Sequence, residues 1–305
     1  MHSKETLIND LHKAGIKKGD TLFVRISYKA VGKVEGGPKT LIDAILDTIG
    51  EEGNLLATAF PKRIESHLRF FHRNEIYKKG QKPSTGAIPA VMSTYPEAKF
   101  SSNPISPYVI IGKNAEEIAS LHTPESESYD VVKFIIENFN PKCLRIGGDI
   151  LDGTAHLAFS EGLRNTHNYQ RRIGEGMYYL DEYGKKRWKE RSVSAFCYHG
   201  FGVFFNNYIK NTPAVLYEGK VGDGDSMITR MKDTYLIEHK YIAEDPQILK
   251  CNSPTCVMCN VSYSYSNLRQ FLLNVTKHLF SKDWKNSIYL YCLILKIYIL
   301  GKKCT

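Results

Sequence analysis

The sequence lacks the patterns that mark exported and membrane-spanning chains. Its start, MHSKETLINDLHKAGIKKGD, has the pattern of an amphipathic helix and not that of a basic start followed by an apolar run. The apolar run NSIYLYCLILKIYIL contains Lys296 and is shorter than about 18 residues, the length that a bilayer requires. This run predicts a docking helix or an edge strand, with a peripheral membrane contact as the alternative. We therefore expect a cytoplasmic protein without a transmembrane segment, whose seven cysteines are reduced thiols.

Signatures of several common enzyme classes are also missing. No Walker A motif occurs, and no G-x-G-x-x-G follows a predicted strand, which argues against P-loop and dinucleotide-binding folds. G-x-S-x-G and H-E-x-x-H are absent too, so serine hydrolases and zinc proteases lose their usual support. No internal repeat or low-complexity linker divides the chain, and we expect residues 1–305 to form a single domain.

A complete set of metal ligands is not evident either. Cys251, Cys256 and Cys259 follow a C-x4-C-x2-C spacing, which leaves a structural zinc site one ligand short. His239 or Cys292 could supply the fourth ligand after folding, but a reduced loop without metal is the expected state. Residues 251–305 are treated as a C-terminal extension of undetermined role.

The charge balance is basic but has no long basic run. The chain contains 41 Lys and Arg against 32 Asp and Glu, a formal net charge of +9. Because the basic residues are dispersed, they predict a solvated surface and argue against nucleic-acid binding. A small anionic substrate such as a nucleotide or coenzyme A fits this balance better than a polycation does.

Helices and strands are predicted to alternate in the first half of the chain. This alternation indicates an α/β layer architecture. Beyond Arg172 the pattern changes to exposed strands and polar segments, so the C-terminal half is expected to have α+β character. The predicted helices are 4–14, 38–50 and 83–95, and the predicted strands are 21–27, 54–60, 108–112 and 143–146.

Candidate functional residues follow the ends of two predicted strands. His156 follows the glycine turn after the strand at 143–146, and a strand end that leads into a helix is a frequent ligand site in α/β proteins. The alternative is a histidine buried in the core with its hydrogen bonds satisfied; His199, among aromatic neighbours, fits that structural role better. The segment VRISYKAVGKVEGGPKT joins another strand end to glycines and to a helix start at Pro38. The free amides and dipole of such a start favour an anion, although many helices begin after glycines.

Several ordered blocks resemble the aminoglycoside 3-N-acetyltransferase family. GIKKGDTLFV, VEGG and EEGNL match the N-terminal pattern, and STGAIPAVMSTYPEAKFSSNP and GKVGDGDSMITRMKD follow in the family's order. The resemblance runs from about Leu7 to Asp233. It implies an α/β/α sandwich with a mixed central sheet, and an enzyme that transfers an acetyl or larger acyl group from acyl-CoA to an amine on a sugar.

The resemblance also implies roles for individual residues. The family histidine matches His156, whose imidazole would accept the amine proton, a step suited to a group that titrates near neutrality. The family's H-S-S-L aligns with Arg25 to Tyr28, where only Ser27 is retained. The expected contacts to coenzyme A are Arg25, Ser27, Tyr28, Gly36, Gly37, Lys39 and Thr40, and the expected contacts to the acceptor are Asn103, Thr154 and Glu161.

Departures from the family pattern bear on the acceptor. Phe159 stands where family members commonly have a glutamate, and Glu161 lies two residues further on, where a helix faces another side. Asn103 replaces the histidine of the family's H-P dipeptide. Because a polycation needs carboxylates around it, we expect a nucleotide-linked amino sugar for surface polysaccharide synthesis. Aminoglycoside 3-N-acetylation, which confers antibiotic resistance, and a non-catalytic binding protein on the same fold are the alternatives; a homodimer is left open.

Overall fold

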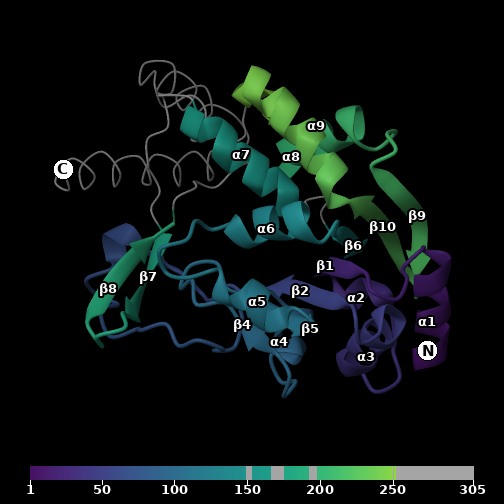
Figure 1. The fold of residues 1–305 in the computed structure, drawn as a ribbon, viewed down its shortest axis with the longest axis horizontal. Coiled ribbons are helices and arrows are strands. Elements are labelled where there is room, and N and C mark those ends of the chain that lie inside the picture. The colour runs from purple at the N-terminus through teal and green to yellow at the C-terminus, as the bar shows by residue number, and fades with distance from the viewer. Residues whose placement is uncertain (149–152, 166–174, 192–197, 250, 252–305) are drawn as a thin grey trace, which may run out of the picture.

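A seven-stranded mixed sheet forms the centre of the protein (Figure 1). The computed structural model describes residues 1–148, 153–165, 175–191, 198–249 and 251. The strand order in the sheet is β4-β5-β2-β1-β6-β10-β9. In chain order these strands are β1 (Thr21–Ile26), β2 (Asn54–Thr58), β4 (Lys99–Phe100), β5 (Tyr108–Gly112), β6 (Lys142–Ile146), β9 (Val215–Val221) and β10 (Gly224–Arg230).

The centre of the sheet is parallel and its two sides are antiparallel. Strand β1 pairs with β2 and with β6 in parallel, so the carboxyl ends of these three strands lie at one edge. Strands β5 and β10 join on the two sides in the antiparallel direction, followed by β4 and β9. The mixed sheet predicted from the resemblance is confirmed.

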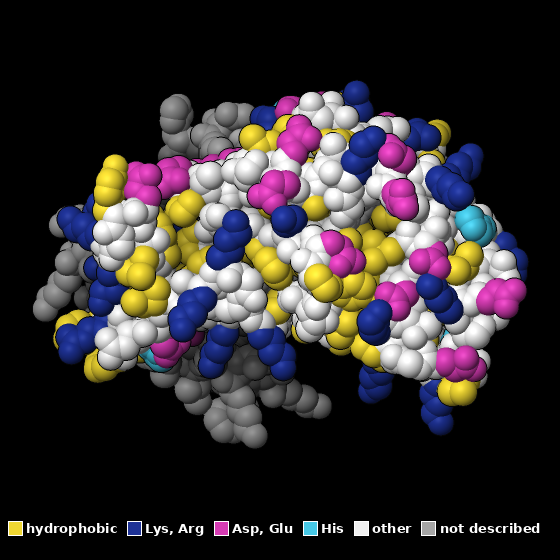
Figure 2. Space-filling model, turned by 60° about the horizontal axis from the view of Figure 1, so that its bottom comes forward, with side chains coloured by type: hydrophobic (Ala, Val, Ile, Leu, Met, Phe, Trp, Pro, Cys, Tyr) yellow, Lys and Arg dark blue, Asp and Glu magenta, His cyan; other side chains and the backbone are white. Residues whose placement is uncertain are grey.

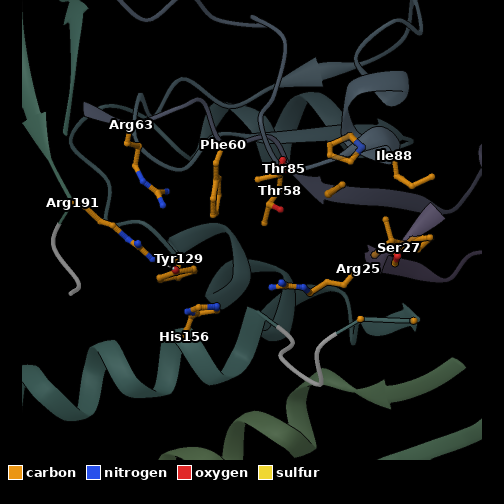
Figure 3. Close-up of a pocket in the computed structure, with 16 residues that line it drawn as sticks. Arg25, Ser27, Thr58, Phe60, Arg63, Thr85, Ile88, Tyr129, His156 and Arg191 are labelled. Atoms are coloured by element: carbon orange, nitrogen blue, oxygen red, sulfur yellow. Dashed lines mark hydrogen bonds between the residues drawn. The ribbon is translucent and has the colours of Figure 1, made fainter. Parts of the chain in front are cut away.

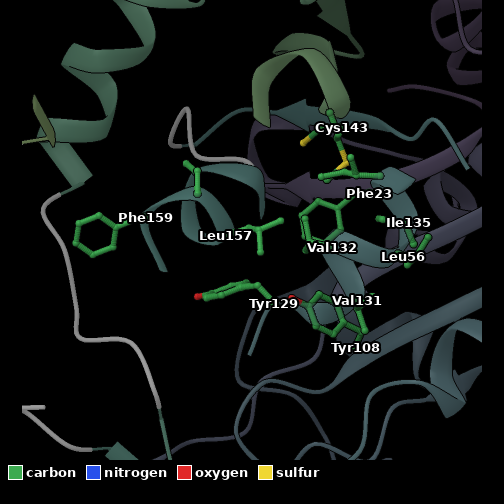
Figure 4. Close-up of a cluster of buried hydrophobic side chains, with 14 of the residues drawn as sticks. Phe23, Leu56, Tyr108, Tyr129, Val131, Val132, Ile135, Cys143, Leu157 and Phe159 are labelled. Atoms are coloured by element: carbon green, nitrogen blue, oxygen red, sulfur yellow. The ribbon is translucent and has the colours of Figure 1, made fainter. Parts of the chain in front are cut away.

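Helices cover both faces of this sheet. Consecutive side chains of β1 alternate between two hydrophobic clusters: Phe23 packs on the side of α6 and α7, and Leu22 and Val24 pack on the side of α1 and α3. Figure 4 shows the first cluster, where Phe23, Leu56 and Tyr108 from the sheet meet side chains of α6 and α7. The helices are α1 (Lys4–Lys13), α2 (Tyr28–Val31), α3 (Pro38–Ile49), α4 (Ala87–Met92), α5 (Ala115–Ser120), α6 (Asp130–Asn138), α7 (Gly153–Asn165), α8 (Tyr198–Tyr208) and α9 (Met231–Glu244), with 3₁₀ turns η1 (Ser66–Leu68) and η2 (Pro246–Leu249).

Local signals in the sequence set several helix ends. Ser3 caps α1 in a capping box with Thr6, Pro38 occupies the first turn of α3, and Gly50 ends α3 at a positive φ of 66°. The predicted helix at 83–95 is too long at both ends, since α4 runs from Ala87 to Met92. The Ser84 amide and the Thr85 hydroxyl instead donate to the carbonyls of Phe60 and Thr58, which ties the preceding segment to the end of β2.

A second, three-stranded sheet lies apart from the central one (Figure 1). It is built by β3 (Ile64–Glu65), β7 (Glu175–Leu180) and β8 (Lys186–Glu190), all paired in the antiparallel direction. Tyr178 packs edge-on against Trp188 across its centre, at 4.8 Å between ring centroids. Together with the β9–β10 hairpin, this sheet confirms the α+β character expected beyond Arg172.

Two further expectations concern the distribution of basic side chains on the surface and the presence of a membrane-spanning helix. On the face drawn in Figure 2, Lys and Arg side chains are interspersed with acidic and hydrophobic ones, as the dispersed sequence pattern predicts. Within the described residues, no helix has the length and apolar character needed to cross a bilayer. The apolar run containing Lys296 lies outside the described residues.

Candidate active site

A cavity of about 420 Å³ opens where the parallel strands end (Figure 3). The carboxyl ends of β1 and β2, the turn after β6 and the first turns of α7 contribute to its wall, and the segments that flank the small sheet complete it. Such an edge is the usual ligand site of α/β sheets. The cavity is lined by Val24, Arg25, Ile26, Ser27, Ala57, Thr58, Phe60, Arg63, Thr85, Ile88, Pro89, Tyr129, Gly147, Gly148, His156 and Arg191.

The glycine turn after β6 lets the chain pass close to the end of β1. Gly147 has a φ of +60°, and a Cβ atom there would lie 2.3 Å from the Cβ of Ala30 and 3.3 Å from that of Ser27. Its amide donates to the carbonyl of Asp225 at 2.8 Å. The close approach of this turn to Ala30 and Ser27 therefore requires glycine at position 147.

His156 lies on the cavity side of α7, where its ring is stacked on that of Tyr129. It is 8% exposed, and its ring is nearly parallel to that of Tyr129, with 5.0 Å between centroids and 9° between planes. The ring of Phe201 of α8 is tilted by 32° against the imidazole, with 6.2 Å between centroids. The imidazole is thus held in one orientation while it still lines the cavity.

The surroundings of His156 favour its neutral form. Burial lowers its pKa well below the usual 6.5, and the positive charges of Arg25, Arg191 and Arg63 lower it further. At neutral pH the ring is therefore an uncharged imidazole, which can accept a proton from a reacting group.

Three arginines give the cavity wall a positive character. Arg63 Nε donates to Glu175 Oε2 at 2.8 Å, and Arg191 Nη1 lies 3.5 Å from the same oxygen. Arg191 Nη2 also donates to the Tyr129 hydroxyl at 3.0 Å, which connects it to the ring stacked on His156. Burial lowers the pKa of Arg63, and the charge of Arg191 adds to that effect.

Comparison with known proteins decides the family. The model of the family described as aminoglycoside 3-N-acetyltransferase matches residues 23–243, more than half of the chain. The chain belongs to this family. Membership confirms the resemblance seen in the sequence and identifies the protein as a coenzyme A-dependent N-acyltransferase.

Named relatives and solved structures agree with this membership. Aminoglycoside N(3)-acetyltransferase III of Serratia marcescens is 26% identical over 204 residues, which cover 62% of this chain and 74% of the relative. The structure of aminoglycoside acetyltransferase AAC(3)-IVa matches with a TM-score of 0.71 at 22% identity, over 86% of this chain and 96% of that one. The structure of AAC-IIIb with CoASH matches with a TM-score of 0.68 at 20% identity, over 80% and 97%. At these identities the structures establish the shared fold, and the α/β/α sandwich is confirmed.

The site residues expected from the family pattern fall into separate groups. Arg25, Ser27 and His156 line the cavity together, although no contact tests their roles. The helix start with Gly36, Gly37, Lys39 and Thr40 is not part of the cavity wall. Tyr28 is not part of the wall either, and its hydroxyl would be 4.0 Å from a Cβ atom at Gly37.

The Lys39 side chain contacts Asp43 and Tyr95. Its ammonium group pairs with Asp43 at 2.8 Å and lies 4.9 Å from the centre of the Tyr95 ring. The expectation that Lys39, Thr40 and the two glycines contact coenzyme A stays a prediction.

Asn103 and Thr154 are fully buried and engaged in hydrogen bonds. The Asn103 side-chain amide donates to the carbonyls of Thr123 and Ser126, and its oxygen accepts from the backbone amides of Ile105 and Ser106. The hydroxyl of Thr154 is 3.1 Å from that of Thr234 on α9. Neither residue belongs to the cavity wall, so their expected contact with the acceptor remains untested.

Glu161 and Phe159 occupy different sides of α7. Phe159 is 1% exposed and packs edge-on against Phe201, whereas Glu161 pairs with Lys133 of α6 at 3.0 Å. Glu161 also accepts a hydrogen bond from the Tyr235 hydroxyl at 2.5 Å. The carboxylate therefore joins three helices and is not part of the cavity wall, and no carboxylate among the described residues takes the position of the family glutamate there.

Most of the cysteine motif lies outside the described residues. Cys251 forms no disulfide with a described residue, whereas Cys256, Cys259 and Cys292 lie outside the described residues, as does the side chain of His199. The part of the chain that the structure describes contains no group of three or more residues able to hold a metal ion.

Sequence reasoning missed Tyr129, Arg63 and Arg191. Arg63 follows the end of β2 by five residues, which is a weak positional signal because the intervening loop is irregular. Arg191 directly follows β8, in a polar segment whose pattern gives no indication of a site. The approach of the small sheet to the end of the large one brings Arg63 and Arg191 to His156, whereas Tyr129 comes from the start of α6.

Proposed function

We propose that the protein transfers an acetyl group from acetyl-CoA to the amine of an amino sugar, with His156 as the general base. The observation that carries the proposal is a neutral imidazole, fixed by Tyr129 stacking, in the cavity at the carboxyl ends of β1, β2 and β6. Family membership supplies the reaction class.

The proposed step moves one proton and one acyl group. The amine nitrogen attacks the thioester carbonyl carbon, and His156 accepts the proton that the nitrogen loses. The carbon–sulfur bond then breaks, and the leaving thiolate takes up the proton that His156 accepted, which gives free coenzyme A and restores the neutral imidazole. A base that is neutral before the reaction is needed for this sequence, and burial supplies it.

The named relatives make an aminoglycoside the first acceptor to consider. The relative from Serratia marcescens is an aminoglycoside N(3)-acetyltransferase, and another solved structure of the family is bound to sisomicin. Acetylation of such an antibiotic at a ring amine would confer resistance.

A nucleotide-linked amino sugar is the second candidate acceptor. The observation that favours it is the group of three arginines in the cavity wall, together with Phe159 in place of a carboxylate. Such a product would be used in surface polysaccharide synthesis, and the acyl group could then be larger than acetyl.

A panel of acceptors tests both candidates in one assay. Thiol release from acetyl-CoA is measured with gentamicin and kanamycin beside dTDP-, UDP- and GDP-linked amino sugars. Turnover of the antibiotics supports the first acceptor, and turnover of the nucleotide sugars supports the second. If no amine is turned over by folded protein, the proposal fails in favour of a binding protein on the same fold.

A further inference from the structure

Arg25 is a charged side chain of the central strand that reaches the cavity. Side chains of a strand alternate between its two faces, so Arg25 lies on the same face of β1 as Phe23, which packs on the side of α6 and α7. Figure 3 shows the Arg25 side chain reaching from the end of β1 toward His156 on α7. One face of the sheet therefore brings this arginine and the proposed base to the same cavity.

The guanidinium of Arg25 is not used to hold the fold together. Among the described residues, this half-buried side chain forms no hydrogen bond or ion pair. Arg145, its register partner on β6, instead donates from Nη1 to the carbonyl of Gly148 at 3.1 Å and is not part of the cavity wall. The five donors of the Arg25 guanidinium are therefore available to a ligand in the cavity.

The charge of Arg25 acts directly on His156. After burial, this charge is the largest cause of the lowered pKa of the imidazole, ahead of the charges of Arg191 and Arg63. Because a Coulomb interaction weakens with distance, the guanidinium and the imidazole lie close together. A carbonyl carbon that is attacked beside His156 therefore has its oxygen in the field of Arg25.

Transfer of an acyl group from a thioester requires a place for negative charge. When the amine nitrogen attacks the carbonyl carbon, an electron pair of the carbon–oxygen double bond moves to the oxygen. The pair returns when the carbon–sulfur bond breaks. A donor directed at this oxygen lowers the barrier, because the charge it meets is larger in the transition state than in the bound thioester.

We propose that Arg25 donates to the carbonyl oxygen of the thioester and stabilises the negative charge that this oxygen carries in the tetrahedral intermediate. The inference rests on the proposed amine acylation at His156 and adds a second catalytic residue to it. His156 passes the proton of the amine to the thiolate, while the guanidinium keeps its own protons throughout.

The position of Arg25 favours the thioester over the phosphates of coenzyme A. In an acyl-CoA the pantetheine arm separates the thioester from the phosphates, so a thioester that reacts beside His156 places the phosphates away from this side chain. A cation at the reacting centre is also compatible with an aminoglycoside. It disfavours the ammonium form of the one amine that must attack as the free base.

The kinetics of Arg25 variants measure this contribution, with acetyl-CoA and the acceptor of the panel that the wild-type protein turns over, gentamicin first. Arg25→Met should reduce kcat about 10²–10³-fold, the usual effect of removing an oxyanion donor, and change the KM for acetyl-CoA less than about threefold. Arg25→Lys keeps the charge and should recover part of the loss. Arg187→Met is the matched control, because it removes one positive charge at an exposed ion pair with Asp181, and it should keep the wild-type kcat.

Two kinetic results would overturn the proposal. One is a kcat within about threefold of wild type in folded Arg25→Met, and the other is a loss confined to the KM for acetyl-CoA, which places Arg25 on the phosphates. If Arg25→Met does not fold, Arg25→Gln takes its place.

The pH dependence excludes an effect through the base alone. Removing Arg25 takes away one of the charges that lower the pKa of His156, so part of the loss at acidic pH would come from protonation of the ring. At about pH 9, well above the ordinary histidine pKa, the ring is neutral in both proteins. We expect the loss in kcat to persist there, and a loss that disappears at this pH would contradict a contact with the thioester.

Infrared spectroscopy of the bound donor separates this inference from the proposed function. Acetyl-CoA labelled with ¹³C at the carbonyl is bound without any acceptor, and its carbonyl stretch is recorded. Because a guanidinium donor polarises the carbonyl bond, we expect a lower frequency on the wild-type protein than in solution, and Arg25→Met should remove most of this shift. That result supports the role of Arg25 even if no amine is acetylated. Equal bands in the two proteins would overturn it, while turnover of an amine would still support the proposed function.

Discussion

At the scale of single residues, the environment of His156 determines its chemistry. A histidine in water is partly protonated near pH 6.5, but burial and three neighbouring arginines keep this ring neutral. The stacked Tyr129 fixes the plane of the ring. These conditions make His156 a proton acceptor with a defined orientation.

Replacing His156 with alanine tests its role as the base. We expect turnover to fall by about two to four orders of magnitude, the usual effect of removing a general base. Coenzyme A should still bind, which calorimetry measures. A folded variant that keeps more than about a tenth of the wild-type turnover would show that another group accepts the proton.

The protonation state of His156 can be observed directly. With ¹³C-labelled histidine, the NMR signal of this ring should remain that of the neutral form at pH 6, because its pKa is lowered in the folded protein. A midpoint at or above 6.5 for His156 would contradict the effect of burial and of the arginines.

At the scale of elements, α7 carries one side chain that lines the cavity, His156, and others that hold neighbouring helices together. Its residues 156 and 159 face the aromatic core, while Glu161 joins α6 and α9 through Lys133 and Tyr235. Residues two apart on a helix face different sides, so the Glu161 carboxylate does not take the place of the family glutamate at position 159.

Glu161→Gln separates a structural role from contact with the acceptor. Loss of the charged hydrogen bonds to Lys133 and Tyr235 should lower the free energy of unfolding by about 1–2 kcal/mol. Denaturant unfolding measures this change, and Lys133→Met should produce a similar one. A large rise in the acceptor KM without loss of stability would instead support the substrate contact predicted from the sequence.

The glycine loop before α3 is the element predicted to hold the donor. Gly37 has a φ of +77°, and a Cβ atom there would have only the Tyr28 hydroxyl nearby, at 4.0 Å. Gly37→Val is expected to raise the KM for acetyl-CoA more than that for the acceptor, because the branched side chain would occupy the path of the donor along the backbone.

A control is needed because valine at a positive φ also strains the backbone. Gly184 has a similar φ of +73° in the β7–β8 turn and nothing within 4 Å, so Gly184→Val reports the strain alone. Comparable losses in melting temperature, with the donor KM raised only in Gly37→Val, support the prediction. If the donor KM is unchanged in a folded Gly37→Val variant, the loop has no part in binding the donor.

At the scale of the whole molecule, burial of histidine makes the fold sensitive to acid. His122 is fully buried, with one ring nitrogen 3.0 Å from the Ser101 hydroxyl and the other 2.9 Å from the Glu127 carbonyl, and desolvation lowers its pKa to about 4. In the unfolded chain the value returns to about 6.5. Between these two values the unfolded state binds more protons, so the free energy of unfolding decreases as the pH falls.

The size of this decrease follows from the difference between the two pKa values. We expect His122 to contribute stability that is present above about pH 6.5 and is lost by about 3 kcal/mol as the pH falls to 4. Urea unfolding at a series of pH values measures the slope, and His122→Gln should flatten it. A slope that is the same in both proteins would show that other groups control acid unfolding.

The sequence by itself determined the elements and one end of the site. Alternating apolar strands and amphipathic helices predict the α/β layers, because side-chain period and turn residues act locally. The family pattern led to His156, Arg25 and Ser27, which the fold brings together because the carboxyl ends of adjacent parallel strands share one edge.

Only the tertiary structure decided what surrounds those residues. Arg63, Tyr129 and Arg191 are far apart in the sequence and follow no spacing rule, yet tertiary packing places them around His156: Arg63 and Arg191 lie at the ends of strands of the small sheet, and Tyr129 lies at the start of α6. The same packing excludes water from the imidazole and thereby lowers its pKa, and it turns Glu161 toward Lys133. Charge balance and desolvation depend on distances between separate segments, and local sequence patterns do not encode those distances.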